Sequence, residues 1–322
     1  MDSTTKRDIK LRKSRVFIAG DTTFYGRNIV NKFLESESWE IVILKEFYNL
    51  SVSDLSYKLN ELKVNFVVVT SGLSFGIEGN LNRTADLCIG NITDLNLISA
   101  SAKAGIEKLI YIGSSCMYPA IPAQSSKKFT VDDILTAIPE LTSLNYTTIK
   151  LAGWSLCQAI MRQYGYRYIT LIPSNVYGPW DDYDSSDSHV VASLIRKIYS
   201  SKSAEMSVVD LLGTGEPIRD FLHVSDLSGA VDFCLKNNDI NCTINIGSGQ
   251  GYQISDIASL ISEYIGYKGE IRFNNRALNG TMFKVLDNSV IESYGWKNSY
   301  DINSGLKNTV NWYLNNHLRR IS

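Results

Sequence analysis

The sequence lacks long apolar runs and has almost no net charge. Nothing in its 322 residues approaches the roughly 18 consecutive apolar residues that a membrane-spanning helix needs. Lysine and arginine number 32 against 33 for aspartate and glutamate, which leaves a net charge of −1. This balance argues against nucleic acid or a membrane surface as a partner.

Cysteine is also scarce and follows no pattern. No two cysteines form a C-x-x-C pair, and the five are Cys88, Cys116, Cys157, Cys234 and Cys242. An odd, scattered set argues against a disulfide framework and against a zinc site. We therefore expect reduced thiols, a cytoplasmic location and no bound metal.

The basic opening segment, residues 1–14, lacks the apolar stretch that a signal peptide needs, and we expect it to be a disordered extension. The chain as a whole has 44% hydrophobic and 20% charged residues, which is the composition of an ordinary globular protein. Its length allows one large domain or two unequal ones.

Apolar strand-like runs alternate with helix-length segments through the first half of the chain. The strand-like runs lie at 15–19, 40–44, 65–70 and 109–112, and the helical patterns at 27–34, 54–62 and 85–104. Continuous apolar strands separated by crossovers are typical of βαβ units in a parallel sheet that is covered on both faces. We therefore predict an α/β fold with a Rossmann-type doubly wound parallel sheet.

The pattern loosens in the second half, where short strands such as 270–274 stand among helices and turns. We predict a dinucleotide-binding domain over residues 15–180 and a smaller α/β substrate-binding lobe that takes up most of 181–322. The boundary is not a single cut, because a strand near 243–246 is expected to return to the first sheet.

The first strand–helix turn, G-D-T-T-F-Y-G, matches G-x-x-G-x-x-G except that Thr23 replaces the middle glycine. Glycines at such a turn allow a pyrophosphate to approach the start of a helix closely. The Cβ of Thr23 narrows that approach, and Asp21 adds negative charge unless it binds a ribose hydroxyl. The loop is compatible with a dinucleotide site and also with a tight turn that binds no nucleotide. Its candidate cofactor contacts are Gly20, Thr22, Thr23, Phe24, Tyr25 and Gly26.

Two charged residues follow the second strand. Glu46 lies twenty residues after Gly26, where a carboxylate would bind the adenosine ribose 2′-hydroxyl of NAD. Lys45 would instead attract the 2′-phosphate of NADP. A solvated charge pair at a strand end explains the same residues, so the sequence leaves NAD and NADP open.

Tyr146 and Lys150 form a Y-x-x-x-K pattern at the start of a helical segment. Residues four apart on a helix share one face, so the lysine ammonium would lower the pKa of the tyrosine. Such a tyrosine can protonate the oxygen that forms when a carbonyl receives hydride. The pattern alone is common by chance, but Ser114 ends a Gly-Ser-Ser strand about thirty residues upstream and adds weight to it.

These segments together resemble the extended short-chain dehydrogenase/reductase family, the NAD-dependent epimerases and dehydratases. P-S-N-V-Y-G-P at 173–179 is similar to the family's element between nicotinamide and sugar. R-D-F-L-H-V-S-D at 219–226 is similar to its nucleotide-sugar clamp, and the resemblance runs from Arg15 to about Leu314. It implies NAD or NADP as cofactor, with NADPH favoured, and a nucleotide-diphosphate-sugar substrate.

Residues 113–119, GSSCMYP, narrow the resemblance to the GDP-L-fucose synthase family of 3,5-epimerase/4-reductases, which act on a 4-keto-6-deoxyhexose. D-S-H-V at 187–190 and G-T-M-F-K at 280–284 match two further segments of that family. The Asp-Glu pair of the related 4,6-dehydratases does not follow the serine here. By this resemblance Cys116 is the base and His189 the acid that invert the carbons beside a 4-ketone.

The resemblance assigns further residues to catalysis and binding. It implies a triad of Ser114, Tyr146 and Lys150, and we expect Ser114 and Cys116 on the same side of an extended chain. A nearby histidine or Lys150 would lower the pKa of the Cys116 thiol. The implied cofactor contacts outside the first loop are Lys45, Tyr146, Lys150 and His189. The implied substrate contacts are Ser115, Asn175, Arg196, Arg219 and Lys284.

The match has departures that leave alternatives open. Thr22 and residues 44–46 stand where bacterial fucose synthases carry arginines for the 2′-phosphate, and Leu212 replaces a tryptophan of the nucleotide clamp. The base is therefore open. A plain 4-keto reductase or 4-epimerase on another nucleotide sugar, and a non-catalytic cofactor-binding protein, remain alternatives. We also expect a homodimer that pairs through the two long helices of the cofactor domain.

Overall fold

The computed structural model describes residues 13–75, 77–120, 126–185, 187–274 and 281–318. The predicted extension at 1–14 lies outside these residues except for its last two, and the first strand begins at Ser14. Gly280 of the G-T-M-F-K segment also lies outside them. In the part of the chain that is described, no helix combines the length and apolar character that would let it cross a membrane.

A six-stranded parallel sheet organises the larger part of the molecule. Its order is β2-β1-β3-β4-β5-β9, and every neighbouring pair runs parallel. The strands are β1 (Ser14–Ala19), β2 (Trp39–Val42), β3 (Phe66–Val69), β4 (Lys108–Ile112), β5 (Arg167–Pro173) and β9 (Ile244–Ile246). The strand order reverses at β1 and β3, and ligands of open α/β sheets bind at the carboxyl ends of such a switch point.

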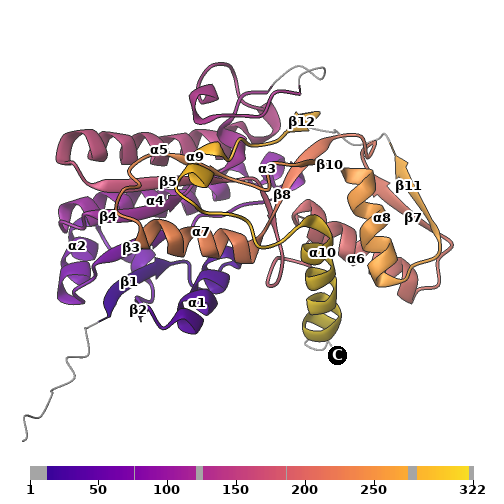
Figure 1. Cartoon of the computed structure of the whole chain (residues 1–322), viewed down its shortest axis with the longest axis horizontal. Helices are drawn as coiled ribbons and strands as arrows, with labels where there is room; N and C mark the ends of the chain where they lie inside the picture. Colours follow the sequence, from indigo (N-terminus) through magenta and orange to yellow (C-terminus); the bar gives the residue numbers. More distant parts are fainter. Residues whose placement is uncertain (1–12, 76, 121–125, 186, 275–280, 319–322) are drawn as a thin grey trace, which may run out of the picture.

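Helices cover both faces of this sheet (Figure 1). On one face lie α2 (Val52–Glu61), α4 (Thr84–Lys103) and α5 (Leu144–Tyr164), and on the other α1 (Phe24–Ser36) and α7 (Val224–Lys236). Alternation along β1 explains the two layers, because Val16 and Ile18 pack with α1 and α7 whereas Phe17 and Ala19 pack with the opposite helices. The predicted Rossmann-type doubly wound fold is confirmed.

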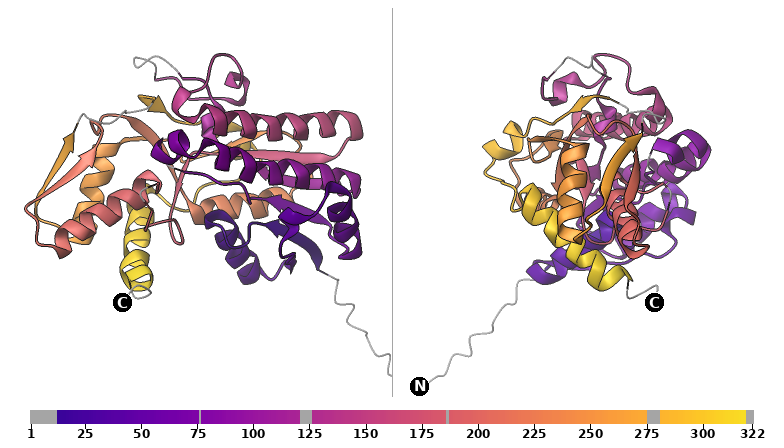
Figure 2. Two further views of the ribbon diagram at one scale, coloured as in Figure 1. Left: turned by 180° about the vertical axis from the view of Figure 1, so that it is seen from behind. Right: turned by 90° about the vertical axis from the view of Figure 1, so that its right-hand side faces the viewer.

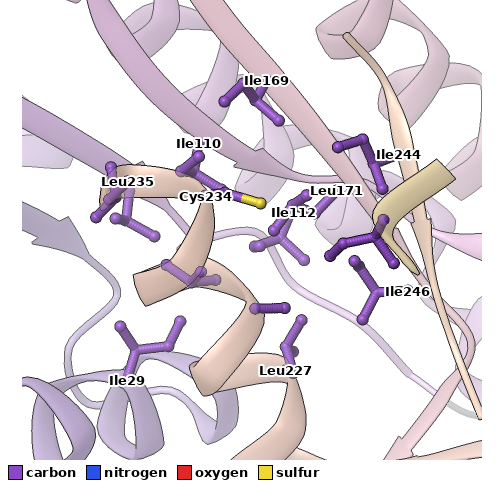
Figure 3. Packing of buried hydrophobic residues seen from close by; sticks show 14 of the residues in the cluster. Ile29, Ile110, Ile112, Ile169, Leu171, Leu227, Cys234, Leu235, Ile244 and Ile246 are labelled. Atoms are coloured by element: carbon purple, nitrogen blue, oxygen red, sulfur yellow. The ribbon is translucent and has the colours of Figure 1, made fainter. Parts of the chain in front are cut away.

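Branched aliphatic side chains fill the layer between the sheet and α7 (Figure 3). Ile110 and Leu171 of the central strands point toward α7, and Cys234 lies among them with its side chain fully buried. Burial raises the pKa of the Cys234 thiol to about 12, so it stays protonated and packs as a small apolar residue.

A second, smaller core lies beside the large sheet. Its strands are β6 (Asn175–Tyr177), β7 (Val208–Leu212), β8 (Ile218–His223), β10 (Gly251–Gln253), β11 (Glu270–Asn274) and β12 (Phe283–Lys284). β8 pairs with β6, β10 and β12, while β7 pairs with β11. The helices that pack with them are α6 (Val190–Ser203), α8 (Ile254–Ile265) and α10 (Ile302–Trp312). Figure 2 shows this lobe at one end of the sheet.

Shorter helical segments connect these elements. They are η1 (Phe47–Asn49), α3 (Ile77–Asn82), η2 (Ser115–Met117), η3 (Val131–Asp133), η4 (Leu141–Ser143), α9 (Ser289–Ser293) and η5 (Tyr313–His317). Three of them, η2, η3 and η4, follow β4 and precede α5, and η2 carries the predicted site residues Ser115 and Cys116.

The chain passes repeatedly between the sheet and the lobe. β5 leads into β6, and β9 pairs with β5 before the chain continues into β10. Asp220 of β8 is fully buried and accepts hydrogen bonds from the N–H groups of Ser248 (2.7 Å), Gly249 (3.2 Å) and Leu286 (3.3 Å). These bonds tie the lobe to the segments that follow β9 and β12.

Candidate active site

The turn after β1 requires glycine at both of its ends. Gly20 has a φ of 85°, and a Cβ on it would lie 2.8 Å from Ser71 Cα. A Cβ on Gly26 would lie 1.9 Å from the Gly20 carbonyl oxygen. The first turn of α1 carries no acidic residue, and its amide groups lack intrahelical partners. A dinucleotide pyrophosphate fits this environment.

Thr23 has a structural role in this turn that the sequence analysis did not predict. It is the N-cap of α1: its Oγ1 accepts from the Gly26 N–H (3.2 Å) and donates to the Gly20 carbonyl (2.7 Å). A threonine directly before a helix is an N-cap signal, and it stands here where the usual loop has its middle glycine. Thr22 is exposed beside it.

Lys45 and Glu46 follow the carboxyl end of β2, next to β1, and both are exposed. Glu46 has a φ of 55° and precedes η1. Both side chains face solvent near the end of the strand that adjoins the first turn. The geometry is therefore compatible with both cofactors: Glu46 could bind the ribose 2′-hydroxyl of NAD, and Lys45 could bind the 2′-phosphate of NADP.

Ser114 and Cys116 lie in a tight helical turn, so the prediction of an extended chain is wrong. Ser114 is the N-cap of η2, and its Oγ accepts a hydrogen bond from the Cys116 N–H at 3.1 Å. Thr147 of α5 donates to the Cys116 carbonyl at 3.0 Å. These two bonds hold the thiol-bearing turn against the start of α5. A serine side chain that caps its own turn overrides the alternation of an extended strand.

Tyr146 is buried in the first turns of α5, with 8% of its surface exposed. Burial raises the pKa of Tyr146, and it outweighs Lys150 and the hydrogen bonds with Ser74 and Ser114, which lower it. The sequence argument considered only the lysine and expected a lowered pKa. Without ligand, the phenol of Tyr146 is therefore a protonated acid.

Lys150 is buried and paired with a carboxylate that the sequence did not identify. Its Nζ lies 3.1 Å from Asp94 Oδ2 and 3.3 Å from the Ile112 carbonyl oxygen. The same Nζ is 5.9 Å from the centre of the Tyr146 ring. Burial alone would lower the pKa of Lys150, but the Tyr111 hydroxyl and the Asp94 carboxylate oppose it and leave the pKa raised. The lysine is a cation held on a fixed partner.

His189 stands directly before α6 and contacts a buried aspartate. Its Nδ1 lies 2.9 Å from Asp181 Oδ1, and its Nε2 lies 3.4 Å from Ser74 Oγ. Burial lowers the pKa of His189, but the charge and hydrogen bond of Asp181 are together stronger and raise it overall. Ser74 also bonds to Tyr146, so one serine connects the tyrosine and the histidine. The sequence analysis did not identify Ser74, although polar residues soon after an apolar parallel strand, here β3, could have indicated it.

Two basic side chains lie together on the lobe side of the site. Lys284 pairs with Arg219 in the register of β12 and β8; Lys284 is buried and Arg219 is half-buried. Glu140 lies 3.9 Å from the Lys284 Nζ and accepts a hydrogen bond from Thr281 Oγ1 at 2.9 Å. Burial lowers the pKa of Arg219, and this effect outweighs Glu140 and Cys116, which raise it. Cys116 is thus close enough to Arg219 to affect the pKa of its guanidinium.

The remaining predicted substrate residues are dispersed. Asn175 of β6 donates to the Asp220 carbonyl at 2.9 Å, and Ser115 is buried within η2. Arg196 lies two turns along α6 from His189, about 10 Å on a helix, and lines a pocket with Lys197 and others. The structure does not bring Arg196 into the cluster of Tyr146 and its neighbours.

No grouping of three potential metal ligands occurs within the described parts of the chain. All five cysteines fall within those parts and are free thiols. The ionisable side chains that the site offers are a phenol, a thiol, an imidazole and a lysine ammonium.

Comparisons with known proteins find matches over most of the chain. The profile of the "NAD dependent epimerase/dehydratase family" matches residues 16–247. A GDP-L-fucose synthase of Sinorhizobium fredii is 34% identical over 305 residues, which cover 94% of this chain and 96% of the relative. GDP-L-fucose synthase 1 of Arabidopsis thaliana is 33% identical, with 96% of each chain covered.

A solved structure with the same fold is a GDP-6-OMe-4-keto-L-xylo-heptose reductase from C. jejuni. The TM-score is 0.82 at 25% identity, with 94% of this chain and 98% of that chain covered. The match extends over the sheet and the lobe together.

Proposed function

The chain belongs to the NAD dependent epimerase/dehydratase family, and from that premise we propose a nucleotide-sugar 3,5-epimerase/4-reductase acting on a GDP-linked 4-keto-6-deoxyhexose. The predicted family and enzyme class, an NAD(P)-dependent oxidoreductase with epimerase activity, are confirmed by the comparisons. One observation carries the proposal. Ser74 bonds to both Tyr146 and His189, so the group for reduction and a group for epimerisation share one site.

In the epimerisation, the thiolate of Cys116 removes a proton from a carbon beside the 4-ketone. Ser114 and Tyr146 donate hydrogen bonds to the ketone oxygen and so stabilise the enolate. His189, kept protonated by Asp181, returns a proton on the opposite face. The carbon is inverted because the proton leaves and returns on different faces.

In the reduction, bound NADPH or NADH supplies the hydride. Tyr146 donates its phenolic proton to the C4 oxygen, which a buried and protonated phenol can do. Lys150 holds a positive charge 5.9 Å from that ring and stabilises the phenolate left behind. The proton and the hydride together convert the ketone to an alcohol.

Arg219 and Lys284 bind the diphosphate of the substrate in this proposal. They are adjacent in register, and Glu140 holds Lys284 at the edge of the site. Two cations side by side suit two phosphate groups. Asn175 and Ser115 contact the sugar, and Arg196 binds toward the nucleotide from the pocket on α6.

The cofactor is of the NAD or NADP type, as the family predicts. The turn between Gly20 and Gly26 would hold its pyrophosphate, with Thr22, Phe24 and Tyr25 at the start of α1 beside it. Lys45 would bind the 2′-phosphate of NADP, and we propose NADPH as the donor. Tyr146, Lys150 and His189 would lie on the nicotinamide side.

A homodimer that pairs through α4 and α5 forms part of the proposal. Large apolar side chains are exposed on these helices and on the neighbouring α3 and η4. They are Leu81 (49% exposed), Ile89 (67%), Ile92 (44%), Leu141 (74%) and Leu144 (38%). A helix that is apolar on its outward face as well as its inward face is normally covered by another surface.

The proposed location is the cytoplasm. All five cysteines are free thiols, and Cys116 must be a free thiol to act as a base. NADPH and nucleotide sugars must also reach the same compartment as the enzyme.

The test is incubation with GDP-4-keto-6-deoxymannose and NADPH or NADH in deuterated water. Loss of reduced nicotinamide together with deuterium at C3 and C5 of the product is the expected result. Nicotinamide oxidation without deuterium would identify a plain 4-keto reductase, an activity of the kind named for the C. jejuni structure. Binding of the cofactor with neither reaction would identify a non-catalytic protein.

A further inference from the structure

The Lys150 ammonium is held in place by two hydrogen-bond acceptors. An ammonium has three N–H donors, and two of them are taken by Asp94 Oδ2 (3.1 Å) and the Ile112 carbonyl (3.3 Å). One donor remains for the side of Tyr146. Lys150 is 5% exposed and Asp94 is 1% exposed, so water does not compete for these bonds.

Asp94 is anchored by the segment that follows β3. Its Oδ1 accepts a hydrogen bond from Ser71 Oγ at 2.6 Å, while its Oδ2 binds the lysine. The backbone at Gly72 is so close that a Cβ there would lie 2.7 Å from Asp94 Oδ2. Both carboxylate oxygens are occupied in a tightly packed place, which prevents the carboxylate from turning away from Lys150.

We propose that Asp94 is a positioning residue for the reduction: it holds Lys150 beside Tyr146 and cancels part of its charge, so that Tyr146 stays a protonated acid. This inference rests on the proposed function, because it concerns the proton that Tyr146 donates. A bare ammonium near a phenol favours the phenolate, whereas an ion pair near the same phenol acts only as a dipole.

The other groups that face Tyr146 do not provide this control. Cys116 of η2, Tyr25 of α1 and Tyr111 of β4 all interact with the site electrostatically. Among the charged groups, Lys150 lies 5.9 Å from the centre of the Tyr146 ring, whereas His189, which reaches the site through Ser74, is paired with its own carboxylate, Asp181. Asp94 is the carboxylate that contacts that lysine.

A protonated phenol is the form of Tyr146 that ketone reduction needs at its start. Reduction of the ketone consumes a proton from Tyr146, whereas oxidation of an alcohol needs the phenolate as a base. A partner that discourages the phenolate therefore suits a reductase. The pair of Asp94 and Lys150 also keeps the lysine beside Tyr146, where its charge stabilises the phenolate that forms when the proton is transferred.

The direct test measures the ionisation of Tyr146 without cofactor or substrate. Tyrosine labelled with ¹³C at Cζ reports ionisation by NMR, and Tyr146→Phe identifies the signal of Tyr146. In Asp94→Asn the pKa of Tyr146 should fall by about one unit, as expected for one charge roughly 10 Å away at an effective dielectric constant of about 20. Ser71→Ala is the control, because it removes a hydrogen bond but keeps the carboxylate; its shift should be much smaller.

A double-mutant cycle covers the case that Asp94→Asn fails to fold with an unpaired buried lysine. Lys150→Met alone should raise the pKa of Tyr146, and Lys150→Met combined with Asp94→Asn should bring it back toward the wild-type value. The double variant buries no charge at this position. An unchanged or higher pKa in Asp94→Asn, or equal values in the double variant and Lys150→Met, would overturn the proposal.

Activity gives a second readout. The high-pH limit of ketone reduction should move to lower pH in Asp94→Asn by the same amount as the NMR pKa, while Ser71→Ala keeps the wild-type limit. A uniform loss of rate at every pH, with no shift in the NMR titration, would show that Asp94 only stabilises the fold. If the enzyme reduces no sugar at all, the proposed function fails while the NMR titration still decides the role of Asp94.

Discussion

His189 Nδ1 lies 2.9 Å from Asp181 Oδ1, and the aspartate side chain is only 2% exposed. The second carboxylate oxygen of Asp181 is buried and makes no hydrogen bond within the described residues. The first oxygen, Oδ1, also accepts the Asp182 N–H at 2.9 Å, and the imidazole is its ionisable partner. A charged partner of this kind keeps His189 protonated over a wider pH range.

Asp181→Asn should therefore narrow the pH range of epimerisation. Burial lowers the pKa of His189, and without the opposing carboxylate the imidazolium is lost at a lower pH. Deuterium incorporation at C3 and C5, followed as a function of pH, should lose its high-pH side first. Asp182→Asn is the matched control, since Asp182 is exposed and has a weaker effect on His189. Identical profiles for Asp181→Asn and wild type would contradict this role.

The pair of His189 and Asp181 also affects stability. Because the pKa of His189 is raised in the folded state, the pair stabilises the fold fully below the unfolded pKa of about 6.5 and less as pH rises through the folded value.

Tyr146→Phe should abolish hydride transfer and leave part of the epimerisation. Reduction needs a proton donor at the C4 oxygen, whereas the enolate keeps Ser114 as a hydrogen-bond partner. Loss of one positioned acid lowers a rate by on the order of 10²–10⁴. Nicotinamide oxidation and deuterium exchange measured in the same sample separate the two steps. Wild-type reduction in this variant would disprove the assignment of Tyr146.

Cys116→Ser should reduce the ketone without inverting its neighbours. A serine hydroxyl keeps the shape of the thiol, but its pKa is far too high for it to act as the base. The product should be the unepimerised sugar with little deuterium at C3 and C5. His189→Asn should alter which carbon is inverted, because the return of the proton is impaired. Cys242→Ser is the matched control, since Cys242 is a half-buried free thiol that packs against the core between the large sheet and α7 and is not part of the turn at 114–117. Deuterium exchange at the wild-type rate in Cys116→Ser would make the thiol a packing group.

Two substitutions at Thr23 distinguish its role as the N-cap of α1 from its effect on cofactor binding. Thr23→Ala removes the cap of α1 and should lower the free energy of unfolding by about 1 kcal/mol, whereas Thr23→Gly should cost only a few tenths. Thr23→Gly also removes the Cβ near the turn and should bind NADPH more tightly than Thr23→Ala or wild type. Titration calorimetry measures the dissociation constant of NADPH, and thermal unfolding in a scanning calorimeter measures the change in the free energy of unfolding. Failure of all three proteins to bind NADPH or NADH would remove the oxidoreductase function.

Ile89→Asp combined with Ile92→Asp should convert the proposed dimer into a monomer. Both side chains are exposed on α4, and a carboxylate in the centre of an apolar interface is costly when buried. Sedimentation at several protein concentrations measures the change. Leu34→Asp on α1 is the control, because Leu34 is 63% exposed on the opposite face of the sheet and should leave the assembly as it is. Wild-type protein that sediments as a monomer would contradict the interface.

The sequence by itself determined the features that depend on residues near one another in the chain. Apolar runs with crossovers between them predicted a parallel doubly wound sheet, because strand and helix periods are local. The glycines of the first turn and the four-residue spacing of Tyr146 and Lys150 are local in the same way. These patterns, together with GSSCMYP, were enough to identify the family.

Only the tertiary structure decided which groups control those residues. Asp94 reaches Lys150 across 56 residues of sequence, and Ser74 reaches His189 across 115, so no local spacing reveals either contact. The raised pKa of Tyr146 has the same origin, because burial is a property of the packed core that a Y-x-x-x-K pattern does not contain. Ser114 shows the limit at short range: its hydroxyl caps a three-residue turn, Ser115–Met117, at a place where the sequence analysis expected the chain to stay extended. The sequence determines which ionisable side chains are present, but their protonation states depend on neighbours that folding brings together.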